Sequence, residues 1–255
     1  MNEIFKKGLI RFFDPIAIRL GYKNNGIQRL EQHHKNNLLH NFYILLKSME
    51  FEPAHIIDVG ANHGTWTREA LIEFPNCRFT LLEPQSRMKD SIKDLLDINP
   101  KISFYAVGAG KESGSFKFTI VDRDDSCSFN YSEKEAKEKG YEQIEIPVVT
   151  LNEFVEAEDL PIPDIIKIDA EGLDLEVLQG ASNFFGKTEV FMVEAGVAIK
   201  EFKNSFLALM NFMDNKGYRL LDITDMNRPF TSKVLWLVEL VFVKKGGIID
   251  SHKWI

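Results

Sequence analysis

The sequence predicts an α/β fold: a mostly parallel seven-stranded sheet with helices on both faces, an N-terminal helical segment and a β insertion. From Pro53 onward, short apolar runs alternate with helical patterns, which is typical of a parallel sheet covered on both sides. Two of these runs, 56–59 and 165–168, end in polar, glycine-bearing turns that lead directly into a helix. With 255 residues, 44% of them hydrophobic, the chain can bury one sizeable core.

The elements are predicted in order from hydrophobic periodicity. Large apolar residues recur at helical spacing in residues 1–50, the predicted helical extension, and 51–255 form the main domain with an insertion at about 115–149. The predicted strands span about 56–60, 79–83, 102–107, 164–169, 189–195, 218–223 and 235–243. The predicted helices span about 64–73, 85–97, 172–185 and 200–215, and Gly217 is expected to cap the last one.

The insertion contains two strand-like segments, 115–121 and 143–149, on either side of a polar stretch at 122–140. Alternating charges at 132–139 predict an exposed helix. Residues 122–126 are similar to the start of a calcium loop, but Cys127 occupies the sixth position, which needs glycine. We therefore expect a polar loop that either faces a substrate or is simply solvated.

Composition excludes several classes of protein. The net charge of -7 and the lack of a long basic block argue against a nucleic-acid partner and favour a small-molecule substrate. The two cysteines, Cys77 and Cys127, are far apart and form no disulfide or zinc pattern, so we expect a cytoplasmic setting. The N-terminus lacks a signal-peptide pattern, and the longest late apolar run, 234–243, is too short to cross a bilayer.

The turn at 58–64 has the order strand, glycine turn, helix, which is typical of a nucleotide-like ligand site. Asn62 and Thr65 stand where a dinucleotide fingerprint has its second and third glycines, which weighs against NAD. Glu83 ends the next predicted strand about 20 residues later, where an acid can bind ribose hydroxyls. A ribose-bearing ligand without a pyrophosphate fits, and S-adenosylmethionine is such a ligand. A plain turn with a solvated Glu83 is the alternative interpretation.

Three further acids, Asp169, Glu171 and Glu194, follow or end predicted strands. Because ligands bind outside the carboxyl ends of parallel strands, these acids should lie beside the 58–64 turn. They are suited to bind an ammonium group, to take a proton from a hydroxyl or to hold a divalent cation. The alternative for Glu171 is that it complements the N-terminus of its helix. His63 is a further candidate base, ranked below the acids.

These motifs together resemble the FkbM-type methyltransferases, a branch of the Rossmann-like class I S-adenosylmethionine-dependent enzymes. The resemblance rests on Asp58-Val59-Gly60-Ala61-Asn62-His63-Gly64, Glu83-Pro84, Val149-Thr150-Leu151-Asn152-Glu153-Phe154, Lys167-Ile168-Asp169-Ala170-Glu171-Gly172 and Glu176-Val177-Leu178-Gln179-Gly180-Ala181. It covers about residues 55–195, so residues 1–50 lie outside it. Asn152 departs from the family, which often has an acid there.

The resemblance implies methyl transfer from S-adenosylmethionine, commonly to an oxygen of a sugar or another small hydroxylated metabolite. The implied cofactor residues are Asp58, Gly60, Ala61, Asn62, Gly64 and Glu83, with Val107 bordering the adenine. Asp169 is the leading candidate for contacting the cofactor amino group or serving as the base, with Glu171 and Glu194 as alternates.

Several alternatives stay open at this point. A divalent cation could acidify the acceptor hydroxyl, but no third oxygen ligand is evident from the sequence. The rival functions are a noncatalytic Rossmann-like domain that binds a nucleoside or a protein, and an NAD-dependent enzyme. The sequence leaves the acceptor and the oligomeric state, including a homo-oligomer, undetermined.

Overall fold

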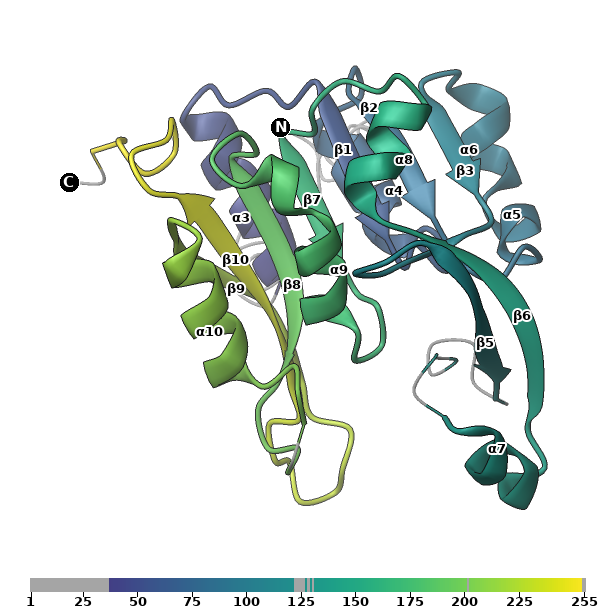
Figure 1. Cartoon of the computed structure of the whole chain (residues 1–255). Helices are drawn as coiled ribbons and strands as arrows, with labels where there is room; N and C mark the ends of the chain where they lie inside the picture. Colours follow the sequence, from purple (N-terminus) through teal and green to yellow (C-terminus); the bar gives the residue numbers. More distant parts are fainter. Residues whose placement is uncertain (1–36, 122–126, 128, 130, 201, 254–255) are drawn as a thin grey trace, which may run out of the picture.

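The central sheet has seven strands in the order β3-β2-β1-β7-β8-β10-β9 (Figure 1). This order comes from a computed structural model, which describes residues 37–121, 127, 129, 131–200 and 202–253. The strands are β1 (His55–Val59), β2 (Arg78–Leu82), β3 (Ile102–Tyr105), β7 (Ile165–Ile168), β8 (Val190–Gly196), β9 (Tyr218–Asn227) and β10 (Leu237–Lys244). The pairs from β3 to β8 are parallel, and β10 runs antiparallel to both neighbours. The predicted mostly parallel seven-stranded α/β sheet is therefore confirmed.

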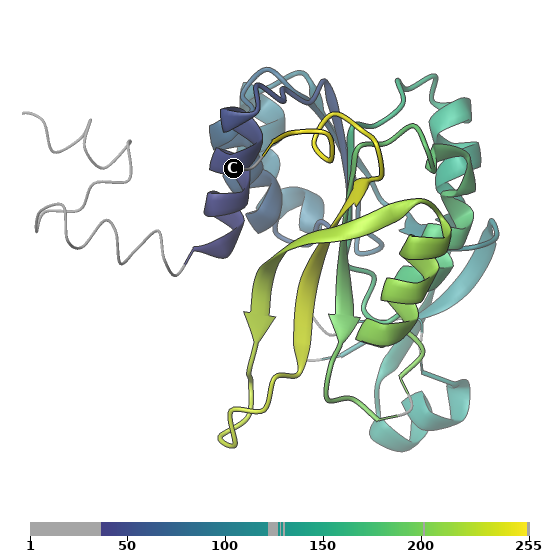
Figure 2. The ribbon, with the colours of Figure 1, turned by 90° about the vertical axis from the view of Figure 1, so that its left-hand side faces the viewer.

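Helices cover both faces of the sheet, as Figure 2 shows. On one face, α8 (Leu151–Ala157), α9 (Asp174–Gly180) and α10 (Phe206–Asn215) pack through one apolar cluster. On the other face, α3 (Leu38–Ser48), α4 (Thr65–Glu73) and α6 (Lys93–Ile98) pack through a second cluster. Every residue of β1 and β7 is buried, because these central strands lie between both clusters.

The predicted helix bounds were wrong in three places, each for a local reason. The helix expected over 85–97 is divided at Ile92 into α5 (Met88–Ser91) and α6. The helix expected over 172–185 begins only at α9, because Glu171 and Gly172 have left-handed φ values of 48° and 96°, and it is followed by a short 3-10 turn, Ser182–Phe184. The helix expected from 200 begins at Phe206, where the Ser205 side chain caps it.

The insertion forms a second, three-stranded sheet in the order β4-β6-β5. Its strands are β4 (Gly108–Ala109), β5 (Gly114–Ile120) and β6 (Glu142–Val149), and Figure 1 shows β5 and β6 extending as an arm that ends near α7 (Glu133–Lys139). Ser132 and Glu135 form a capping box that starts α7. Both strand predictions and the helix prediction for this region are confirmed.

Two predicted segments lie outside the described residues. They are the calcium-like stretch 122–126 and residues 1–36 of the predicted helical extension. The described remainder of that extension is α3, whose Phe42, Tyr43 and Leu46 are buried in the second cluster. Within the described part of the chain, no helix combines the length and apolar character that a membrane span needs.

Candidate active site

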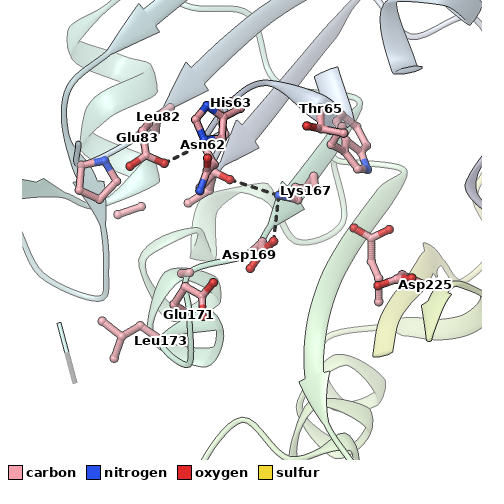
Figure 3. Close-up of a pocket in the computed structure, with 18 of the residues that line it drawn as sticks. Asn62, His63, Thr65, Leu82, Glu83, Lys167, Asp169, Glu171, Leu173 and Asp225 are labelled. Carbon is pink, nitrogen blue, oxygen red and sulfur yellow. Dashed lines mark hydrogen bonds and ion pairs between the residues drawn. The ribbon is translucent and has the colours of Figure 1, made fainter. Parts of the chain in front are cut away.

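A cavity of about 1410 Å³ opens at the carboxyl ends of β1, β2 and β7 and extends to the ends of β9 and β10 (Figure 3). Seven of the ten predicted site residues line it: Gly60, Ala61, Asn62, Glu83, Val107, Asp169 and Glu171. The cavity is not lined by Asp58, Gly64 or Glu194. Asp58 and Gly64 are close in sequence to lining residues, and Glu194 lies on β8, which neighbours two strands that contribute lining residues. The topology therefore brings most of the sequence-predicted residues to one cavity.

The turn after β1 is shaped by two left-handed residues, Gly60 (φ 73°) and Asn62 (φ 46°). The amide groups of Gly60 and Ala61 both donate to the carbonyl of Leu82, at 2.9 and 3.2 Å, which ties the turn to the end of β2. A Cβ atom at Gly60 would lie 1.9 Å from the carbonyl oxygen of Asp169. Glycine is therefore required here by contact between the ends of β1 and β7, in addition to any ligand.

Gly60→Ala should destabilise the protein much more than Gly140→Ala. Both glycines have nearly the same φ, 73° and 72°, but a Cβ at Gly140 meets nothing within 4 Å. The left-handed backbone alone costs about 1–3 kcal/mol, and forced overpacking adds about 1–3 kcal/mol at Gly60 only. Urea unfolding of the two variants measures the difference, and equal free energies of unfolding would contradict the packing explanation.

Glu83 is a buried carboxylate, 3% exposed, that holds the turn from the other side. Its Oε2 accepts a hydrogen bond from the backbone N–H of Asn62 and its Oε1 accepts one from that of Gln85, both at 2.9 Å. Burial raises its pKa above the ordinary value, and these two hydrogen bonds oppose the shift. Each oxygen retains acceptor capacity for a ligand hydroxyl, because an ionised carboxylate offers about four lone-pair positions.

Lys167 lies at the centre of the site and joins three groups. Its Nζ is 3.4 Å from Asp58 Oδ1, from Asp169 Oδ2 and from the carbonyl oxygen of Gly60. Burial lowers the pKa of Lys167, but the carboxylates of Asp58, Asp169 and Glu239 outweigh that effect and raise it above its ordinary value. The side chain is 6% exposed, that of Asp58 is 0% exposed and that of Asp169 is 38% exposed. Asp169 is thus the member of this ion cluster that a ligand can reach.

Asp58 supports the helix after the turn as well as the ion cluster. Its Oδ2 accepts a 2.6 Å hydrogen bond from the Thr67 hydroxyl on α4. Gly64 is the N-cap of α4 with φ 72°, and a Cβ there would lie 2.8 Å from Ile92. These two predicted residues therefore support the shape of the turn from outside the cavity.

Glu194 occupies a partly buried position on β8, directly opposite Glu239 of β10. Burial raises the pKa of Glu194 to about 10, and the nearby charges of Asp169, Asp174 and Glu171 add to the shift. Burial also raises the pKa of Glu239 to about 7, although Lys167 opposes this shift. The raised pKa favours the neutral carboxyl of Glu194, and a neutral carboxyl does not suit a base.

Glu194→Gln should raise thermal stability in a pH-dependent way. The raised pKa means that the neutral carboxyl favours folding fully below the unfolded pKa of about 4.3, and that this benefit is lost as pH rises toward about 10. Glutamine resembles the neutral form at every pH, so the gain in Tm over the wild type should grow between pH 5 and pH 8. A gain that is the same at both pH values would contradict the assignment.

Sequence reasoning assigned no site role to several polar residues of this cavity, among them Lys167, Thr224, Asp225 and Glu239. Lys167 and Glu239 each interrupt an apolar strand, at 165–168 and 237–243, and a charge inside a buried strand is the signal that could have identified them. Thr224 donates to Glu239 from the neighbouring strand. Asp225 pairs with Glu239 across strands only because β9 runs farther than predicted, to Asn227.

The polar side chains of the cavity suit the expected organic cofactor. Among the described residues, no group of three His, Cys, Asp or Glu side chains is arranged to hold a metal ion. The cavity does offer buried polar atoms to an organic ligand: Asn62 Oδ1 and Trp66 Nε1 belong to lining residues and have no hydrogen-bond partner within the described part of the chain. The surplus of carboxylates suits a cationic ligand. These residues fit S-adenosylmethionine, which carries ribose hydroxyls, an ammonium group and a sulfonium.

The sheet order and the cavity at the carboxyl strand ends define a class I methyltransferase fold. The chain belongs to the FkbM methyltransferase family, because the family described as Methyltransferase FkbM domain matches residues 58–220, more than half of its length.

Individual proteins similar to this chain share limited sequence identity with it. The chain is 29% identical over 161 residues to the hexuronic acid methyltransferase AglP of Haloferax volcanii, a match that covers 62% of this chain and 63% of that protein. Among solved structures, a precorrin-6y C5,15-methyltransferase from Geobacter metallireducens is 14% identical, with a TM-score of 0.45 over 78% of this chain and 85% of that one. The 1,6-didemethyltoxoflavin-N1-methyltransferase of Burkholderia thailandensis is 10% identical, with a TM-score of 0.44 over 94% and 89%.

Proposed function

We propose that this protein transfers a methyl group from S-adenosylmethionine to a hydroxyl oxygen of a sugar or another small hydroxylated metabolite. The observation that carries the proposal is the reachable carboxylate of Asp169, which lies 3.4 Å from buried Lys167 and in the same cavity as Glu83 and the 60–62 turn. Membership in the FkbM family supports methyl transfer. Similarity to the hexuronic acid methyltransferase of Haloferax volcanii supports a sugar acceptor.

The proposed cofactor residues are those of the turn and the two adjoining strand ends. Gly60, Ala61 and Asn62 would hold the methionine and ribose parts, Glu83 would accept from the ribose hydroxyls, and Val107 would border the adenine. The free Oδ1 of Asn62 is an additional acceptor. Asp58 and Gly64 act indirectly, by fixing the turn against α4.

When bound, the cofactor supplies an activated methyl group on a sulfonium. The chain must therefore mainly align the acceptor hydroxyl and accept its proton. Asp169 is the proposed base or ammonium anchor, because its carboxylate lines the cavity and Lys167 holds it in place. Glu171 follows it on the same loop and is the first alternate. Glu194 is the second alternate in the proposal, and its raised pKa of about 10 ranks it last.

The proposal also covers the need for a divalent cation and the cellular location of the protein. A divalent cation is not needed in this scheme, since a carboxylate at Asp169 can remove the proton. We also propose a cytoplasmic location, because Cys77 and Cys127 are far apart in the sequence and form no disulfide pattern.

The test is a methyl-transfer screen with labelled S-adenosylmethionine and the full chain, against hydroxylated sugars, glycolipid precursors and other small metabolites. The proposal expects label in at least one hydroxylated acceptor. Cofactor binding without transfer to any acceptor would instead favour a noncatalytic nucleoside-binding domain, and binding of NAD in place of S-adenosylmethionine would favour a nicotinamide enzyme.

A further inference from the structure

Acidic side chains occupy paired positions across three neighbouring strands at the far end of the cavity. Glu239 of β10 is directly opposite Glu194 of β8 on one side and Asp225 of β9 on the other. Ionised acids at directly opposite positions repel each other and destabilise a sheet, and the raised pKa of Glu194 lowers this cost for its pair with Glu239. Glu239 and Asp225 both line the cavity, together with Thr224, whose hydroxyl donates to Glu239. A costly arrangement of this kind at a cavity wall indicates a role in recognition.

The cavity offers these acids no free cation within the described part of the chain. Lys167 is the only lysine or arginine among the described lining residues. Its ammonium group has three hydrogens, and its three neighbours, Asp58, Asp169 and the Gly60 carbonyl, are matched to them. A carboxylate on a ligand would therefore meet acids here with no cation to pair with it.

The size of the cavity leaves room for an acceptor at this end. The volume of about 1410 Å³ exceeds the roughly 300–1,000 Å³ of most small-molecule sites, which leaves room for a second molecule beside a cofactor.

We propose that Asp225 and Glu239 are specificity-determining residues that select an acceptor bearing hydroxyl or ammonium groups and lacking a carboxylate. The acids would accept hydrogen bonds from such groups and repel an acidic sugar. The inference rests on the proposed methyl-transfer function. It also separates this protein from its relative in Haloferax volcanii, a hexuronic acid methyltransferase.

The test compares three acceptors that share one ring: the methyl glycosides of glucose, glucosamine and glucuronic acid. The kcat/KM for labelled methyl transfer by the full chain should be at least about 10-fold higher for the neutral or amino sugar than for the uronide, because the carboxylate of the uronide would be repelled by the acids without a cation to compensate it. Asp225→Arg supplies a cation that can pair with the carboxylate of the uronide. This variant should lower the ratio of kcat/KM for the neutral or amino sugar to kcat/KM for the uronide at least about 5-fold. Glu52→Arg makes the same change of charge at an exposed position before β1, outside the cavity lining, and should leave the ratio unchanged.

The outcomes separate this inference from the proposed function. A wild-type preference for the uronide, or a ratio that Asp225→Arg does not move, would overturn the inference while methyl transfer itself stands. Transfer to none of the three glycosides, under conditions where the broader screen also finds no acceptor, would overturn the proposed function and the inference with it.

Discussion

Asp169→Asn should lower kcat/KM for methyl transfer by about 10²–10⁴-fold, the usual contribution of a positioned general base. The side chain lines the cavity, is 38% exposed and is held 3.4 Å from Lys167 Nζ. Asparagine keeps the shape and a hydrogen-bond acceptor for Lys167 but cannot accept a proton. A fluorescence or radiolabel assay under saturating cofactor measures the loss.

Two measurements make the result specific to Asp169. A loss confined to kcat assigns the base role, whereas an equal loss in S-adenosylhomocysteine affinity assigns the ammonium anchor. Asp97→Asn, an identical change at an exposed position of α6, should keep wild-type activity. Activity of Asp169→Asn within about 3-fold of wild type would be too small a loss for a catalytic base and would refute the assignment.

Lys167→Met should lower the free energy of unfolding by about 3–5 kcal/mol, because removing one partner of a buried ion pair leaves a buried charge without compensation. The Asp58 side chain, 0% exposed, would be left with only the Thr67 hydroxyl at 2.6 Å. For a domain of this size, Tm should fall by on the order of 10 °C. Thermal unfolding followed by circular dichroism measures the shift.

The double variant Asp58→Asn with Lys167→Met distinguishes an electrostatic cause from lost packing. Removing both charges should recover a substantial part of the lost stability, since replacing a whole buried pair is often close to neutral. Lys93→Met, at an exposed position of α6, is the matched control and should change Tm little. A double variant no more stable than the single one would indicate that charge is not what Lys167 contributes.

The sheet and much of the site could be predicted because strand ends in a parallel sheet are themselves sequence features. Gly60, Glu83 and Asp169 each end an apolar run, and parallel pairing of β1 with β2 and β7 places those three ends side by side. The placement of these three strand ends follows from the rule that crossover connections return each strand in the same direction, and it does not depend on knowing the ligand.

The remaining site residues depend on pairing that local patterns do not encode. Glu239 enters the cavity because β10 runs antiparallel between β8 and β9, so its position relative to Glu194 and Asp225 follows from register. Asp174 illustrates the converse. Its place in a helical first turn predicts only that it complements the helix N-terminus, whereas the structure shows that it is 1% exposed and accepts hydrogen bonds from Ala170 and Asn204. Burial of a helix terminus is decided by tertiary contacts that sequence periodicity leaves out.

Calorimetric titration of the full wild-type chain with S-adenosylhomocysteine tests the central claim most directly, since every catalytic proposal requires this ligand in the 58–64 turn. We expect saturable binding of one molecule per chain, with a Kd between about 1 μM and 1 mM, the usual range for enzyme ligands, and much weaker binding of NAD. Absence of saturable S-adenosylhomocysteine binding up to about 1 mM, or tighter binding of NAD, would contradict the account.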